Sequence, residues 1–133
     1  MNKDYLLLYL RSILGGMADF SPLLLSELID LIARSGYEEK FFTQLTARLN
    51  QIRALGALVF QAKEFERIDE QICSMHCTGA GYNIRILFVL IEDCFPILLV
   101  AFYERGGKRK TDYTQHIPAA HKRLEEYYGS HSQ

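Results

Sequence analysis

The sequence predicts an α+β fold in which an N-terminal antiparallel helix pair packs on a small curled antiparallel β-sheet, with a C-terminal helix. Two segments between residues 21 and 55 have apolar residues at helical spacing, three later segments resemble strands, and a last helical pattern follows. The chain has 133 residues, of which 49% are hydrophobic and 23% are charged, so it can bury a core of its own. We therefore expect one domain over residues 1–133.

The helix pair has clear start and stop signals. Ser21-Pro22 places a capping hydroxyl before a proline at the first helical position, and Gly36 ends that helix. A second helix is expected over residues 38–55, closed by Gly56. The apolar stripes are Leu24, Leu25, Leu28, Ile29 and Ile32 in the first helix, and Phe41, Phe42, Leu45, Leu49 and Ile52 in the second.

Three strands are expected after the helix pair, over Gln71–Cys77, Tyr82–Ile91 and Pro96–Tyr103. The short links between them leave no room for a crossover helix, so they predict an antiparallel meander. In the middle strand, Tyr82 and every second residue after it form an uncharged face that should lie on the helices. Arg85 then points to the opposite, more open face, as a salt-bridging surface residue or as a functional one.

The two ends of the chain are less regular. Residues 104–113 form a glycine-hinged basic loop, and a last helix is expected from about Ile117 to Tyr128, with Pro118 near its start. Residues 5–14 are compatible with a strand or a short helix. We favour an edge strand, because apolar residues occupy both alternating faces.

The charge balance is uneven along the chain. The net charge is −1, so the molecule as a whole has no attraction to a polyanion. Residues 102–123, in contrast, contain six Lys and Arg against two Asp and Glu. This local excess of positive charge is the more informative feature of the sequence.

The cysteines and the N-terminus indicate a cytoplasmic protein. Cys73, Cys77 and Cys94 are an odd number, and neither an export signal nor an apolar run of about 18 residues is present, so no membrane contact is expected. Cys73-x-x-His76-Cys77 resembles zinc-ligand spacing. Strand alternation places His76 on the face opposite both cysteines, so buried thiols and no metal are expected.

Four motifs in a fixed order resemble the RelE/ParE superfamily of type II toxin–antitoxin toxins, most closely the HigB-like, phage-derived branch. They are the strand YNIRILF at 82–88, the strand ILLVAFY at 97–103, the basic KRKT at 108–111 and the helix residues His116, Ile117, Pro118, Ala120, Arg123 and Tyr127. Gly56 and the KEF segment at 63–65 also match positions of that family.

The resemblance implies a RelE-like toxin domain that acts as a metal-independent endoribonuclease, without a cofactor. Such enzymes cleave mRNA, usually on the ribosome, by attack of a 2′-hydroxyl on the adjacent phosphate. The implied partners are a small cognate antitoxin of helix-turn-helix type, mRNA and the ribosome.

The same resemblance assigns catalytic roles to Arg85, His76, His116 and Lys110. Arg85 matches the family's strand arginine, whose planar donors suit a phosphate. His76 stands where a basic residue is common, either as a general base or as a sign that this role is lost. His116 matches an acid–base position, and capping of the last helix is its alternative.

The implied RNA-binding residues are Lys108, Arg109, Tyr113, Arg105 and Arg123. Tyr113 could stack on a base or simply close the loop over the core. The residues around Lys108 could equally form a solvated charge run.

A second class of function remains open. The chain could be a non-catalytic RelE/ParE-fold binding protein, either a gyrase inhibitor or a degenerate regulatory relic. Convergence of Arg85, His76, His116 and the loop lysines on one phosphate would favour the nuclease.

Overall fold

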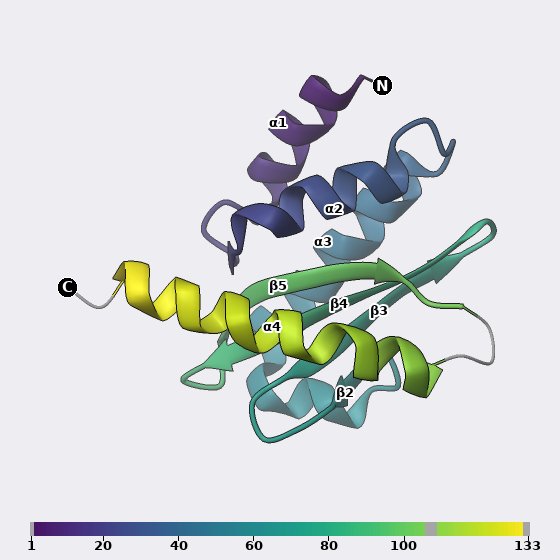
Figure 1. Cartoon of the computed structure of the whole chain (residues 1–133). Helices are drawn as coiled ribbons and strands as arrows, with labels where there is room; N and C mark the ends of the chain where they lie inside the picture. Colours follow the sequence, from purple (N-terminus) through teal and green to yellow (C-terminus); the bar gives the residue numbers. More distant parts are fainter. Residues whose placement is uncertain (1, 106–108, 132–133) are drawn as a thin grey trace.

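The computed structural model describes residues 2–105 and 109–131, with the backbone alone for residues 109–112. The elements, in chain order (Figure 1), are α1 (Lys3–Leu14), β1 (Asp19–Phe20), α2 (Pro22–Ile32), α3 (Glu38–Leu55), the 3₁₀ helix η1 (Gly56–Gln61), β2 (Phe65–Arg67), β3 (Cys73–Gly79), β4 (Tyr82–Ile91), β5 (Phe95–Tyr103) and α4 (Arg109–His131).

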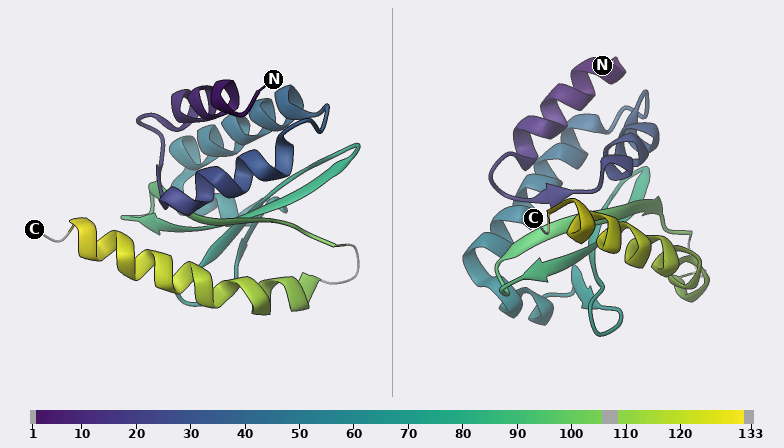
Figure 2. Two further views of the ribbon diagram at one scale, coloured as in Figure 1. Left: turned by 45° about the horizontal axis from the view of Figure 1, so that its top comes forward. Right: turned by 60° about the vertical axis from the view of Figure 1, so that its left-hand side comes forward.

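The molecule has three layers, with α1, α2 and α3 on one face of the sheet and α4 on the other (Figure 2). The strand order is β1-β5-β4-β3-β2. The predicted antiparallel meander is confirmed for β3, β4 and β5. Two short edge strands were not predicted: β2 pairs antiparallel with β3, and β1 pairs parallel with β5, so the sheet is mixed. With two and three residues, these edge strands are too short to show an alternating pattern.

The predicted helix pair is confirmed as α2 and α3, and its apolar stripes are buried. The end of α3 depends on the conformation of Gly56, whose φ is 55°. A Cβ at this position would lie 2.6 Å from the carbonyl oxygen of Asp93 in the turn between β4 and β5. Only glycine therefore lets the chain leave α3 against that turn.

The edge strand expected over residues 5–14 is wrong, since this segment is the helix α1. Leu6, Leu10 and Leu14, spaced by four residues, are fully buried, and the side chain of Asn2 accepts a hydrogen bond from the backbone N–H of Tyr5 at 2.8 Å. The helical period was hidden because apolar residues also lie on the outer side, where Leu8 is 69% exposed.

The two faces of β4 contribute to two separate cores. Tyr82, Ile84, Ile86 and Phe88 pack with α1, α2 and α3, as predicted. Leu87 and Val89, on the opposite face, pack with α4. The expectation that this second face is more open is therefore wrong, because α4 covers it.

The last helix is longer than predicted, because α4 begins at Arg109 rather than near Ile117. Pro118 lies inside the helix and is exposed, so the helix continues through it without crowding the sheet. Proline is favoured at the first helical position but does not require it, so Pro118 was misleading, whereas Pro22 is the first residue of α2 as predicted. The expected capping by the Ser21 hydroxyl is wrong, because Ser21 precedes α2 without a side-chain cap hydrogen bond. In the described part of the chain, every helix is too short or too polar to span a bilayer.

Replacement of Phe88 by Ala tests the strand register. Phe88 is fully buried, with ring centroids 6.4 Å from Phe60 and 6.3 Å from Phe65. Phe88→Ala should lower the free energy of unfolding by about 3–5 kcal/mol in denaturant titrations, because it leaves a cavity. Tyr103→Ala is the control, since Tyr103 is 46% exposed and its loss should be less than about 1 kcal/mol. Equal small losses for both variants would contradict the register.

Candidate functional site

A mostly polar group of side chains from β3, β4, α4 and the end of β5 meets on the α4 face of the sheet. His76, Arg85 and Phe102 lie directly opposite one another on three neighbouring strands. Side chains of paired residues project to the same face, with Cβ atoms about 4.5–5.5 Å apart. We call this group the α4-face cluster, and its members are Ser74, His76, Asn83, Arg85, Phe102, Glu104, Tyr113 and His116.

The centre of the cluster is an ion pair between Arg85 and Glu104. Nε of Arg85 donates to Oε2 of Glu104, and the two residues are only 6% and 9% exposed. The guanidinium carbon also lies 5.9 Å from the ring centroid of Tyr113. Nη1 of Arg85 is buried and has no hydrogen-bond partner among the described residues. One edge of the guanidinium is thus neutralised, while another retains an unused donor.

Backbone pairing beyond β5 fixes Glu104 in this position. The N–H of Glu104 donates to the carbonyl oxygen of Asn83 at 2.8 Å. The side-chain Nδ2 of Asn83 donates in return to the carbonyl oxygen of Glu104, also at 2.8 Å. The strand is therefore extended by one residue, and the Glu104 carboxylate is held against Arg85.

His76 is held in place from three directions. Its Nε2 is hydrogen-bonded to Oδ1 of Asn83. Its backbone N–H donates to the carbonyl oxygen of Glu64 at 2.8 Å, and its carbonyl oxygen accepts from Nε of Arg48 at 2.9 Å. The imidazole is partly exposed, so a ligand at the surface can reach it.

Tyr113 and His116 reach the cluster from α4, one helical turn apart. The hydroxyls of Tyr113 and Ser74 share a hydrogen bond at 3.1 Å, and both residues are buried. The ring of His116 stacks on Phe102 with centroids 4.2 Å apart. Tyr113 thus closes over the core, and His116 does not cap the last helix, because α4 begins seven residues earlier.

The remaining predicted residues are only partly placed. Lys108 and the side chains of Arg109 and Lys110 lie outside the described residues. Arg105 is exposed and follows Glu104 directly.

Arg123, expected to bind RNA, is not part of the cluster. Its guanidinium donates to both carboxylate oxygens of Glu27 at 2.7 and 2.9 Å and to the carbonyl oxygen of Leu99 at 2.8 Å. It also lies ten residues beyond Tyr113, or about 15 Å along α4. Arg123 therefore ties α4 to α2 across β5, and its contact with RNA stays a prediction.

Ser74, Asn83 and Glu104 were missed as cluster members. Asn83 is two residues from Arg85 on β4, and Ser74 is two residues from His76 on β3. Residues two apart in a strand share a face, so this spacing was the available signal. Glu104 gave a different signal, as an acidic residue directly after a buried apolar strand and before a basic segment.

The cysteines lie on the other side of the sheet from this cluster. Cys73 and Cys77 pack in the core beneath α1, α2 and α3, and His76 points away from them, as predicted. Burial raises the pKa of the Cys73 thiol to about 11 and that of Cys77 to about 12. Across the described residues, no three metal-binding side chains are grouped.

Thiol titration tests this placement. At pH 8 the native protein should react quickly with an aromatic disulfide reagent at one thiol, that of the exposed Cys94, because Cys73 and Cys77 are protonated and buried. Cys94→Ser should remove the fast phase, and denaturant should release the two slow thiols. Fast reaction of Cys73 or Cys77 in the folded protein would contradict the assigned faces.

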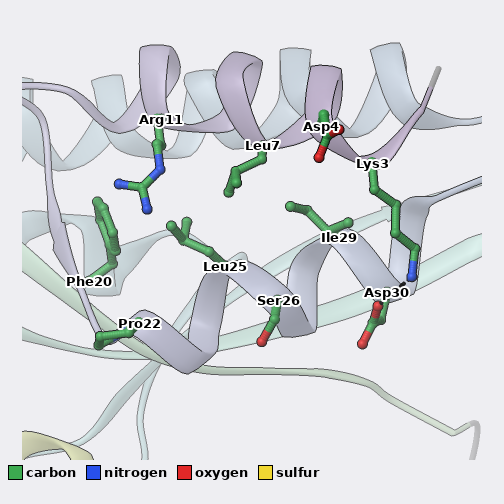
Figure 3. Close-up of a pocket in the computed structure, with 10 residues that line it drawn as sticks. All are labelled: Lys3, Asp4, Leu7, Arg11, Phe20, Pro22, Leu25, Ser26, Ile29 and Asp30. Atoms are coloured by element: carbon green, nitrogen blue, oxygen red, sulfur yellow. Dashed lines mark hydrogen bonds and ion pairs between the residues drawn. The ribbon is translucent and has the colours of Figure 1, made fainter.

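A groove of about 530 Å³ lies between α1 and α2, on the layer opposite α4 (Figure 3). Its floor is apolar and includes Leu7, Leu25 and Ile29. At one end Nζ of Lys3 lies 3.1 Å from Asp30. The described residues that line the groove include no histidine or tyrosine, in contrast to those of the α4-face cluster.

No protein-family model, curated protein or solved structure matches the chain. The chemistry of the α4-face cluster is therefore the basis for a function. It combines a guanidinium, two imidazoles and a phenol. Such a set can hold a phosphate and transfer protons without a metal ion.

Proposed function

We propose that the chain is the toxin of a type II toxin–antitoxin system and cleaves mRNA as a metal-independent endoribonuclease. The observation that carries the proposal is the direct pairing of His76 with Arg85 on β3 and β4, together with the unused Nη1 donor of Arg85. A proton acceptor thus lies beside a phosphate-binding donor. The resemblance of the strand and helix motifs to the RelE/ParE superfamily supports the same activity.

The reaction requires only groups of these kinds. His76 takes the proton of the RNA 2′-hydroxyl, whose oxygen attacks the adjacent phosphorus. Arg85 stabilises the negative charge that develops on the phosphate oxygens. His116 gives a proton to the departing 5′ oxygen, which leaves a 2′,3′-cyclic phosphate and a 5′-hydroxyl end.

The basic segment that begins at Arg105 supports RNA as the substrate. This segment follows Glu104 directly in the sequence and includes Lys108, Arg109 and Lys110. Its positive charges are therefore close in sequence to a member of the cluster. Attraction to phosphates needs such a local excess, because the net charge is −1. The proposed partners are mRNA on the ribosome and a small antitoxin that neutralises the toxin.

One observation favours a second candidate, a non-catalytic binding protein of the same fold. Arg85 is neutralised by Glu104 and is 6% exposed, which reduces the charge available for a transition state. In that case the chain would arrest growth by contact with a protein such as gyrase, or would be a regulatory relic.

Inducible expression with mapping of RNA ends tests the proposal. The wild type should arrest growth and produce new 5′-hydroxyl ends in mRNA, in the presence or absence of a chelator. His76→Gln should lower the cleavage rate by roughly 10²–10⁴-fold, the contribution typical of a general base. His76 is suited to this test because its substitution removes no buried charge, unlike that of Arg85.

The matched control is His131→Gln, at the far end of α4, where the imidazole stacks on Tyr127. This variant should cleave RNA like the wild type. Growth arrest by the wild type without new RNA ends would contradict the nuclease and favour the binding protein.

A further inference from the structure

The side-chain amide of Asn83 has a fixed orientation. Its nitrogen donates to the carbonyl oxygen of Glu104 at 2.8 Å. A carbonyl oxygen can only accept, so the NH₂ group must face Glu104 and the amide oxygen must face the other way. The return bond from the N–H of Glu104 to the carbonyl oxygen of Asn83 holds the two backbones together.

This orientation determines which nitrogen of His76 carries a proton. Oδ1 of Asn83 faces Nε2 of His76, and an amide oxygen is an acceptor only. Nε2 must therefore be the donor. In the neutral imidazole, the second nitrogen, Nδ1, then has the lone pair. Among the described residues, Nδ1 takes part in no hydrogen bond that would occupy this lone pair.

The ring has little freedom to reverse this arrangement. The backbone N–H of His76 donates to the carbonyl oxygen of Glu64, and the carbonyl oxygen of His76 accepts from Nε of Arg48. A ring flip of 180° would put Cε1 in the place of Nε2 and break the bond to Asn83. The amide, for its part, could not turn to donate without losing its bond to Glu104. The chain of contacts from Glu104 through Asn83 to His76 thus allows one tautomer.

We infer that Asn83 is a positioning residue that holds neutral His76 in the Nε2–H tautomer, so that Nδ1 is the proton acceptor of the site. The base role of Nδ1 rests on the proposed function, whereas the tautomer does not. Asn83 itself does not touch the reacting atoms.

The proton balance of the proposed step is consistent with this tautomer. The 2′ O–H bond breaks, an N–H bond forms at Nδ1, and the oxygen electron pair forms the new bond to phosphorus. His76 becomes an imidazolium with protons on both nitrogens. The proton on Nε2 remains hydrogen-bonded to Oδ1 of Asn83 throughout, so His76 gains its charge without a change of hydrogen-bond partner.

Nitrogen-15 NMR of the histidine rings tests the tautomer directly. In the wild type at a pH where His76 is neutral, Nε2 should have the protonated shift and Nδ1 the unprotonated one. The Nε2 proton should exchange slowly with water. Asn83→Leu should speed this exchange, because it removes the acceptor. Asn50→Leu, at an exposed position of α3, is the control and should leave both signals unchanged.

A wild-type spectrum with the proton on Nδ1, or equal exchange in wild type and Asn83→Leu, would overturn the inference whether or not RNA is cleaved. If Asn83→Leu does not fold, the wild-type spectrum still decides between the two tautomers, and Asn83→Asp supplies the second variant. A carboxylate at this position keeps an acceptor for Nε2, so its Nε2 proton should stay protected.

Cleavage assays then separate the two proposals. With the Nε2–H tautomer confirmed, Asn83→Leu should lower the cleavage rate by up to the roughly 10²–10⁴-fold that a general base supplies, with an unchanged circular dichroism spectrum. An Nε2–H tautomer in a wild type that produces no new RNA ends would refute the nuclease and leave the positioning by Asn83 intact. Cleavage by Asn83→Leu at the wild-type rate would refute a catalytic need for the positioning of His76 by Asn83.

Discussion

The buried contact between Arg85 and Glu104 is the interaction on which the α4-face cluster depends. Both residues lie where β4, the end of β5 and α4 meet, and both are largely removed from water. A buried charge requires a partner, since loss of one member of such a pair typically costs about 3–5 kcal/mol. The Glu104 backbone also bonds to Asn83, which in turn orients His76. Asn83 thus links the buried ion pair to the partly exposed imidazole of His76.

The position of α4 makes this arrangement possible. Besides its apolar residues, α4 has polar ties along its length: Tyr127 donates to Asp19 at 2.5 Å, and His121 lies 2.8 Å from Asp69. The bond to the Asp19 carboxylate raises the pKa of the Tyr127 hydroxyl to about 12. These two bonds tie the helix to both edges of the sheet, and the bond from Arg123 to Glu27 ties it to α2. The anchored helix then presents Tyr113 and His116 to the cluster.

Much of the fold could be predicted because its signals are local. Alternation along β4 assigned both faces correctly, and Gly56 marked the end of α3. Gly36 was a poorer marker, because α2 already ends at Ile32. The start of α4 and the nature of α1 could not be predicted in the same way. Residues 109–116 are polar, and α1 is apolar on its outer side too, so neither segment shows a clean helical stripe.

The candidate site was predictable in its members but not in its environment. Arg85 and His76 could be assigned to one face from alternation alone, and the structure places them opposite each other. The burial of Arg85 depends on where α4 docks, and its pairing with Glu104 depends on the strand register, so both required the three-dimensional structure. The same holds for Arg123, whose ion pair joins residues 96 positions apart.

A double-mutant cycle on Arg85 and Glu104 is the most direct test of the central role of this pair. Arg85→Met and Glu104→Met should each lower the free energy of unfolding by about 3–5 kcal/mol, and the double variant should lose clearly less than the sum. The same cycle on the exposed Lys3–Asp30 pair should give a coupling of no more than about 1 kcal/mol. Additive losses at Arg85 and Glu104, or single losses as small as those of the control pair, would contradict the account.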